Sequence, residues 1–235
     1  MSIDLKTSNI SIIIPTLNEA ETVGTLLSQL QGLAGVEVIV VDGTSHDGTD
    51  AVVEKSGARL IQSSADRALR LNKGAEGAHG DILLFLHCDT KLASGFVEQV
   101  RDALNQPGVS AGAFQLSIDG KDFGLRVIEW LANFRSKVFQ MPYGDQGIFV
   151  TTNMFFSVGA FPPQPIMEDF ELLRKLKKKG TVKILPLHAT TSARRWQRLG
   201  ILKTTAINQA IIIGYLFGVS PEKLAGWYRK KQAEG

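Results

Sequence analysis

The stretch Ile82-Leu83-Leu84-Phe85-Leu86-His87-Cys88-Asp89-Thr90 decides the fold. Its first five residues are all apolar, which is typical of a strand buried on both faces of a parallel sheet. The polar residues that follow would lie at the carboxyl end of this strand, where open α/β sheets place their ligands. A carboxylate there, Asp89, can hold a divalent cation against a phosphate group. The stretch therefore predicts both an α/β sheet and a ligand site at its edge.

Strand and helix patterns alternate from residue 10 to residue 90. Apolar runs at 10–14, 36–41 and 59–61 predict three more strands, and apolar residues at helical spacing separate them. This alternation predicts an α/β fold with a parallel sheet and right-handed crossovers.

The pattern after residue 90 is less regular, but it also predicts both kinds of element. No linker or internal repeat divides the chain, so we expect one domain over residues 1–235. We expect strands at 111–118, 148–156 and 182–185, and helices at 96–104, 123–139, 167–179, 199–217 and 221–231.

Composition limits the possible classes of protein. With 44% hydrophobic and 21% charged residues, the chain is typical of a globular protein, and a single cysteine excludes an intrachain disulfide. The net charge of +3 gives no argument for nucleic acid, and we expect no such partner. The N-terminus lacks a signal-peptide pattern, and the apolar segment 207–219 is shorter than the roughly 20 residues that span a membrane. We therefore expect a cytoplasmic protein whose C-terminal helices are buried, form a dimer contact or lie on the inner membrane surface.

Two acids at strand ends are candidate ligand residues. Asp42 and Asp89 follow different strands and would share one sheet edge with Pro15, where Asp42 can accept hydrogen bonds from a ribose or base. Structural alternatives exist for neighbouring residues. Thr16 and Glu19 match a capping box, and Asp89 could itself cap the next helix.

Later motifs also have a functional and a structural interpretation. Glu168 and Asp169 would open a helix, where acids are stabilised by the helix dipole by about 0.3–1 kcal/mol. Either could instead act as a general base. The Arg194-Arg195-Trp196 stretch could bind a diphosphate through its guanidinium groups, with the indole as a stacking wall, or form a solvated basic turn.

The sequence also indicates which cofactors to expect. There is no G-x-x-x-x-G-K-[ST] motif, and no G-x-G-x-x-G follows the first strand. Because Cys88 is the only cysteine, a zinc site with His87 is poorly supported, and an oxygen-rich site for Mg²⁺ or Mn²⁺ fits better.

Taken in order, five motifs resemble those of family 2 glycosyltransferases, and the match runs from residue 10 to about residue 196. The Gly144-Asp145-Gln146 loop and the arginine-tryptophan stretch are similar to a compact bacterial branch of that family. The resemblance implies the GT-A fold, a Rossmann-like α/β/α sandwich with a mostly parallel central sheet and C-terminal helices. The motifs are Pro15-Thr16-Leu17-Asn18-Glu19, Val41 to Thr49, His87-Cys88-Asp89, Glu168-Asp169 and Arg194-Arg195-Trp196.

The resemblance also implies roles for matching residues around a nucleotide-diphosphate sugar. Asp169 would be the catalytic base with Glu168 beside it, and Asp89 would be the last acid of the D-x-D metal motif. His87 stands where the first acid usually stands, so it is a second candidate metal ligand. The donor would contact Pro15, Leu17, Glu19, Asp42, Arg67, Asn72, Arg194, Arg195 and Trp196.

The leading hypothesis is an inverting, metal-dependent glycosyltransferase that acts on a hydroxyl acceptor, either lipid-linked or a small molecule. Residues 10–90 would form its nucleotide-binding half, 91–196 its acceptor half and 197–235 its C-terminal helices. One alternative is a nucleotidyltransferase acting on a sugar phosphate. The other is a non-catalytic nucleotide-binding module that docks through its C-terminal helices.

Overall fold

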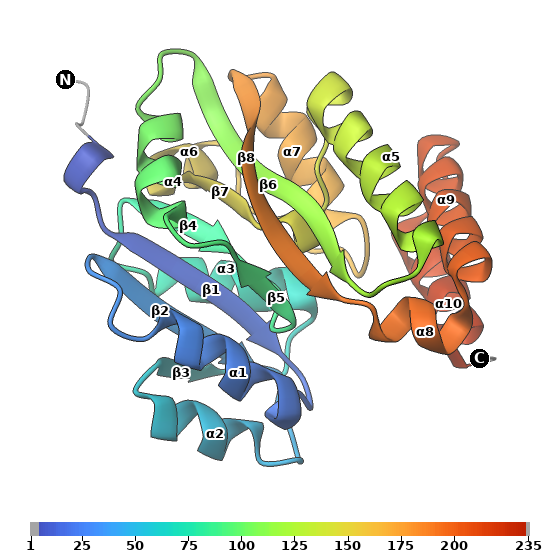
Figure 1. The fold of residues 1–235 in the computed structure, drawn as a ribbon, viewed down its shortest axis with the longest axis horizontal. Helices are drawn as coiled ribbons and strands as arrows, with labels where there is room; N and C mark the ends of the chain where they lie inside the picture. Colours follow the sequence, from blue (N-terminus) through green and yellow to red (C-terminus); the bar gives the residue numbers. More distant parts are fainter. Residues whose placement is uncertain (1–4, 234–235) are drawn as a thin grey trace.

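The computed structural model describes residues 5–233, and an eight-stranded sheet runs through its centre (Figure 1). The strand order is β3-β2-β1-β4-β7-β6-β8-β5. The strands are β1 (Ile10–Thr16), β2 (Val36–Asp42), β3 (Arg59–Gln62), β4 (Ile82–Phe85), β5 (Thr90–Leu92), β6 (Val109–Asp119), β7 (Ile148–Thr151) and β8 (Thr181–Ser192).

Helices connect the strands and continue beyond the last one. The first half contains η1 (Leu5–Thr7), α1 (Ala20–Leu30), α2 (Thr49–Ser56), α3 (Arg67–Glu76) and α4 (Phe96–Leu104). The second half contains α5 (Phe123–Phe139), η2 (Gly144–Gln146), α6 (Thr152–Ser157), α7 (Glu168–Lys177), α8 (Arg194–Leu199), α9 (Ile201–Leu216) and α10 (Pro221–Ala233).

The sheet is parallel in its first half and mixed in its second. Strands β3, β2, β1 and β4 all pair in parallel, as the alternation of strand and helix predicts. Strand β7 then runs antiparallel to both β4 and β6, β8 runs parallel to β6, and β5 runs antiparallel to β8. Four of the seven pairings are therefore parallel.

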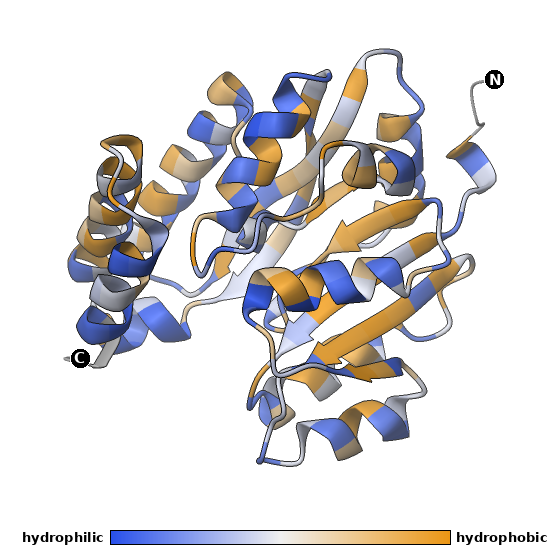
Figure 2. Cartoon of the chain, turned by 180° about the vertical axis from the view of Figure 1, so that it is seen from behind, coloured by the Kyte–Doolittle hydropathy of each residue, from blue (hydrophilic) through white to orange (hydrophobic). Residues whose placement is uncertain are grey.

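Helices cover both faces of the sheet, which gives the expected α/β/α sandwich. Figure 1 shows α1 and α4 in front of the sheet and α3 and α7 behind it. Alternate residues of β1 supply the two cores: Ile12 and Ile14 pack in the cluster with α1 and α4, and Ile13 packs with α3 and α7. Every residue of β4 is buried, as its apolar run predicts. In Figure 2 the central strands are hydrophobic along most of their length.

Close packing explains one glycine of the third helix. A Cβ on Gly74 would lie 2.5 Å from Cγ2 of Ile13, so only glycine lets α3 approach β1 this closely. The approach brings the start of α3, and with it Arg67, to the carboxyl edge of the sheet.

The predicted strand 148–156 is wrong in its second half. Strand β7 ends at Thr151, whose hydroxyl accepts a hydrogen bond from the Met154 amide and so caps α6. The aromatic residues of this segment pack as one turn of helix rather than as a strand. Phe155 lies 5.0 Å from the Phe85 ring and 5.5 Å from the Phe161 ring, between centroids.

The predicted strand 182–185 is too short, because β8 continues to Ser192. Its pairing with β6 jumps from Phe114–Leu185 to Gln115–His188, so Pro186 falls within an irregularity of the ladder. Proline has no backbone N–H to donate to the neighbouring strand. A bulge tolerates proline because the residue there makes no such hydrogen bond. The extension carries Thr191 to the edge of the site.

The predicted helix 199–217 starts too early. Leu199 is the last residue of α8, and α9 begins at Ile201 after Gly200, which separates the two helices.

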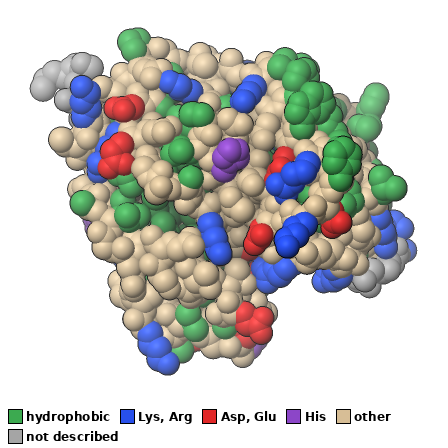
Figure 3. Space-filling view, viewed as in Figure 1, with side chains coloured by type: hydrophobic (Ala, Val, Ile, Leu, Met, Phe, Trp, Pro, Cys, Tyr) green, Lys and Arg blue, Asp and Glu red, His purple; other side chains and the backbone are tan. Residues whose placement is uncertain are grey.

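No helix within residues 5–233 has the length and apolar character needed to cross a membrane. Figure 3 shows hydrophobic side chains gathered over α5, and there the Trp130 and Phe134 rings stack 5.7 Å apart. Contact of the C-terminal helices with a membrane surface or with a second copy of the chain stays a prediction.

Candidate active site

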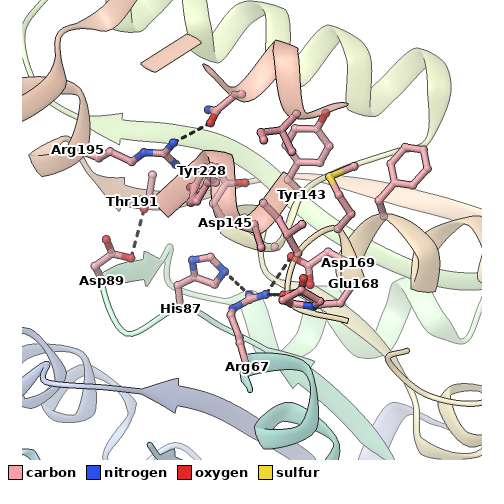
Figure 4. A pocket seen from close by; sticks show the side chains of 18 of the residues that line it. Arg67, His87, Asp89, Tyr143, Asp145, Glu168, Asp169, Thr191, Arg195 and Tyr228 are labelled. Atoms are coloured by element: carbon pink, nitrogen blue, oxygen red, sulfur yellow. Dashed lines mark hydrogen bonds and ion pairs between the residues drawn. The ribbon is translucent and has the colours of Figure 1, made fainter. Parts of the chain in front are cut away.

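A cavity of about 870 Å³ opens between the carboxyl edge of the sheet and the C-terminal helices (Figure 4). Its walls come from the β4–β5 turn, the η2 loop, the start of α7, the end of β8 and helices α8 to α10. It brings together nine of the predicted site residues, namely Glu19, Arg67, His87, Asp89, Glu168, Asp169, Arg194, Arg195 and Trp196. Pro15, Leu17, Asp42 and Asn72 do not line it.

Arg67 joins the predicted catalytic acids to the end of β4. Its Nη1 forms an ion pair with Glu168 Oε1 and lies 3.4 Å from Asp169 Oδ2. Its Nη2 lies 2.6 Å from His87 Nε2. The carboxylates stand in the first turn of α7, and the side chains of Glu168 and Asp169 are only 7% and 18% exposed. One guanidinium therefore holds two side chains of α7 and one that follows β4 in a single cluster.

His87 is a neutral acceptor in this cluster. Burial and, after it, the positive charge of Arg67 lower the pKa of His87 to about 3. Because an arginine only donates hydrogen bonds, the His87 Nε2 atom must accept the bond from Arg67. Arg67 occupies the acceptor nitrogen of His87 in this structure. The hydrogen bond to His87 thus orients the Arg67 guanidinium. Metal binding by His87 stays a prediction.

Asp169 has the electrostatic setting of a base. Burial raises its pKa to about 6, with Glu168 and Asp145 raising it and Arg67 lowering it. A carboxylate with such a pKa is ionised at neutral pH yet is a better proton acceptor than a solvated aspartate. Gly144 lets the η2 loop pass over this carboxylate, because a Cβ there would overlap Asp169 Oδ2.

A second group of charges surrounds Asp89. Its Oδ1 lies 3.5 Å from the Thr191 hydroxyl, and its Oδ2 lies 3.7 Å from Nη2 of Arg194. The same Arg194 nitrogen is 3.5 Å from Glu19 Oε2, so one guanidinium bridges two acids. Burial raises the pKa of Asp89, Arg194 lowers it and Glu19 raises it.

The Asp89 group fits a hard divalent cation. Asp89 and Glu19 offer only oxygen donors, which suits Mg²⁺ or Mn²⁺. Between residues 5 and 233, no cluster of three or more histidine, cysteine or acidic side chains is placed to hold a metal. A cation here would therefore need oxygen atoms from a substrate and from water to complete its shell.

Two structural alternatives from the sequence are wrong. The Thr16 hydroxyl donates to Asp42 Oδ1 at 3.0 Å, and Glu19 at the start of α1 makes no side-chain cap, so the pair forms no capping box. Asp89 does not cap the next helix either, since the N-cap of α4 is Gly95. Both Glu19 and Asp89 are thus left to face the cavity.

The predicted nucleoside residues have structural partners of their own. Asp42 is fully buried and also accepts hydrogen bonds from the amide and hydroxyl of Ser45 at 2.8 and 2.5 Å. The Asn72 amide bonds to the backbone of Phe161 in both directions, at 2.9 and 3.1 Å. Leu17 is half exposed. Contact of these residues with a nucleoside stays a prediction.

Asp145 is a cavity residue that the sequence analysis quoted only as part of a loop. Its Oδ1 is buried and has no hydrogen-bond partner among the described residues. Burial raises the pKa of Asp145, and the nearby Asp89 raises it as well. Buried Gln146 anchors the loop by donating to the Phe114 carbonyl at 2.9 Å and accepting from the Ser136 hydroxyl at 2.8 Å. Its signals in the sequence were the resemblance of the Gly144-Asp145-Gln146 loop to a branch of the family and an acid next to a glycine after Pro142.

Comparison with known proteins gives consistent matches. The glycosyltransferase AglJ of Haloferax volcanii is 34% identical over 68 residues, which are 28% of this chain and 22% of AglJ. The mannosyltransferase PcManGT of Pyrobaculum calidifontis, solved with GDP-Man and Mn²⁺, superposes with a TM-score of 0.64 at 19% identity, covering 97% of this chain and 73% of that one. S. aureus TarS 1–349 with UDP-GlcNAc superposes with a TM-score of 0.61 at 18% identity, covering 78% and 58%.

The structural similarities show the shared fold, which confirms the expected GT-A architecture. The family assignment rests on the sequence. The model of the Glycosyl transferase family 2 matches residues 11–162, well over half of the chain, and the match includes strand β4 with His87 and Asp89 after it. This chain belongs to glycosyl transferase family 2.

Proposed function

We propose that this protein transfers a sugar from a nucleotide-diphosphate sugar to a hydroxyl acceptor, with inversion at the anomeric carbon and with Mg²⁺ or Mn²⁺. One observation carries the proposal: a buried carboxylate of raised pKa, Asp169, shares a cavity with the Asp89, Glu19 and Arg194 group. The bound GDP-Man and UDP-GlcNAc of the structural neighbours support a donor of this class.

The donor would lie between the two groups of charges. Residues 10–90 form the nucleotide half in this proposal, and the diphosphate would sit beside Asp89. Asp89 and Glu19 would hold the cation, which neutralises charge on the departing diphosphate when it is bound. Arg194 lies 3.5 Å from Glu19 and 3.7 Å from Asp89, and both distances are long for ion pairs. Its guanidinium would therefore be able to turn and bind the diphosphate oxygens.

The acceptor half, 91–196, would supply the base. The acceptor oxygen attacks the anomeric carbon from the face opposite the diphosphate, the bond to the diphosphate oxygen breaks, and the acceptor proton moves to Asp169. Arg67 keeps Asp169 ionised before the reaction and stays paired with Glu168 after it. A direct displacement of this kind inverts the configuration of the sugar.

The rate of transfer should depend on the ionisation of Asp169. Protonated Asp169 cannot accept a proton, so kcat is expected to rise as the pH passes about 6 and to level off above it. Steady-state kinetics between about pH 5 and about pH 8.5 would show this limb. A rate that does not change across this range would contradict the assignment of the base.

Asp89→Asn should weaken the joint binding of donor and cation. Loss of the carboxylate removes the predicted metal ligand, and we expect the apparent Kd of a nucleotide-diphosphate sugar with Mn²⁺ to rise by at least about tenfold. Thermal shift with UDP-sugars and GDP-sugars, with and without Mn²⁺, would measure the change. The matched control is Asp102→Asn, which changes an exposed aspartate that does not line the cavity.

The released product distinguishes the reaction classes. A glycosyltransferase releases a nucleoside diphosphate, whereas a nucleotidyltransferase releases inorganic pyrophosphate. A Mn²⁺-dependent thermal shift with a nucleotide sugar, followed by release of the nucleoside diphosphate, is the expected result. Binding without any turnover would instead favour a non-catalytic module, and release of pyrophosphate from a nucleoside triphosphate would overturn the proposal.

A further inference from the structure

The C-terminal helices form a basic wall of the cavity. Five of its lining residues, which we call the C-terminal wall, come from α8 and α10: Arg195, Trp196, Arg198, Tyr228 and Arg229. Figure 4 shows Arg195 beside Tyr228, on the side of the cavity away from Glu168 and Asp169. The C-terminal wall therefore brings guanidinium groups to the side of the cavity opposite Glu168 and Asp169.

The arginines of this wall lack acidic partners. Arg195 donates to Asn208 Oδ1 at 2.8 Å, and its guanidinium carbon lies 4.7 Å from the centre of the Tyr228 ring. Arg229 makes one bond, from Nε to the Ala225 carbonyl at 3.4 Å. In the described part of the chain, none of Arg195, Arg198 and Arg229 forms an ion pair with a carboxylate. Three positive charges at one cavity wall are thus left uncompensated.

Two buried donors at the same wall also lack acceptors. Arg195 Nε and Trp196 Nε1 are both inaccessible to water, and neither has a hydrogen-bond partner within residues 5–233. Buried N–H groups normally find an acceptor, because leaving one unpaired is unfavourable. Unpaired donors beside unpaired cations indicate that an anion belongs at this wall.

This anion is not the diphosphate of the donor. The diphosphate is expected beside Asp89, and Arg194 is the arginine that reaches that group. Arg195 is instead held toward α9 and α10 by Asn208 and Tyr228. Contact of Arg195 and Trp196 with the donor stays a prediction, and the observed contacts of Arg195 direct its guanidinium toward α9 and α10 rather than toward Asp89. This direction favours an anion carried by the acceptor over the diphosphate of the donor.

We propose that the C-terminal wall binds a phosphate group of the acceptor, whose hydroxyl then lies toward Asp169. This inference rests on the proposed function, because it assumes that the cavity holds a donor as well. Guanidinium groups form paired, charge-assisted hydrogen bonds with phosphate oxygens. Ile211, Ile212 and Ala225 line the cavity next to this wall and would contact the carbon skeleton that joins phosphate to hydroxyl. The same chemistry occurs in soluble phosphate esters and in phospholipid headgroups.

The test compares binding of sn-glycerol 3-phosphate with binding of glycerol, by calorimetry at low salt. A lipid arm compares vesicles of phosphatidylglycerol with vesicles of phosphatidylcholine. The variant is Arg198→Gln/Arg229→Gln, which leaves Arg195 and its contacts in place. The matched control is Lys230→Gln, an exposed cation on α10 that does not line the cavity. UDP and GDP with Mn²⁺ are titrated into the same preparations.

We expect wild-type protein to bind glycerol 3-phosphate but not glycerol, and the double variant to bind it at least about tenfold more weakly. Lys230→Gln should bind as wild type does. Binding to phosphatidylglycerol vesicles alone, lost in the double variant, would support a lipid source for the phosphate. If neither probe binds, or if both variants bind equally, the proposal is wrong. Failure of UDP and GDP to bind would instead count against the proposed donor site, whatever the phosphate result.

Discussion

Asp169→Asn is expected to lower kcat for sugar transfer by about 10³-fold, because general-base catalysis contributes about 10²–10⁴-fold. The amide has nearly the shape of the carboxylate but cannot take the acceptor proton. The neighbouring contacts survive the change, since Arg67 keeps its ion pair with Glu168. Neutralising one of two buried acids that share a single arginine also removes a repulsion, so the free energy of unfolding should not fall.

Measuring donor affinity and turnover on the same variant separates chemistry from binding. We expect Asp169→Asn to retain the wild-type thermal shift with donor and Mn²⁺, because Asp89 and Arg194 are untouched. Asp102→Asn should match wild type in both measurements. Turnover of Asp169→Asn at the wild-type rate would show that another group accepts the proton, whereas loss of donor binding would assign Asp169 a ground-state role.

The parallel half of the fold could be predicted because each element there carries a local signal. The apolar run of β4 and the apolar spacing of α1 depend only on neighbouring residues, and short crossovers leave one topology. The second half of the fold was harder to predict from the sequence. Pro186 looks like the end of a strand, and only the irregular pairing of β8 with β6 lets the strand pass it.

The acidic side of the candidate site could also be anticipated from strand ends and helix starts. Asp89 and Asp169 lie in the cavity as expected, since the carboxyl ends of strands converge at one sheet edge. The basic wall could not be anticipated, because Arg195 and Arg229 are far apart in sequence and meet only through the packing of α8 to α10. The role of His87 was equally hidden, since its partner Arg67 lies on another element.

Arg67→Met is expected to destabilise the protein and to shift its pH profile. Removing the guanidinium leaves Glu168 and Asp169 without a counter-charge, and breaking a buried ion pair in this way costs about 3 kcal/mol or more of unfolding free energy. Arg67 also lowers the pKa of Asp169, so the limb of kcat that wild type shows near pH 6 should move toward neutral pH. Urea unfolding and the pH dependence of kcat would measure the two effects.

The pH dependence of the destabilisation gives a stricter test. Without Arg67, the pKa of Asp169 in the folded protein is raised further, so the folded protein binds more protons than the unfolded chain and its stability falls as the pH rises. The loss should therefore be larger at about pH 8 than at about pH 5, where protonation removes the unpaired charges. Arg67→Lys is the control, because it keeps the positive charge and loses mainly the second contact, to His87. In this variant the rise of kcat with pH should stay near pH 6. A pH-independent loss of stability in Arg67→Met would show that packing around the side chain, and not its charge, holds the first turn of α7 against α3.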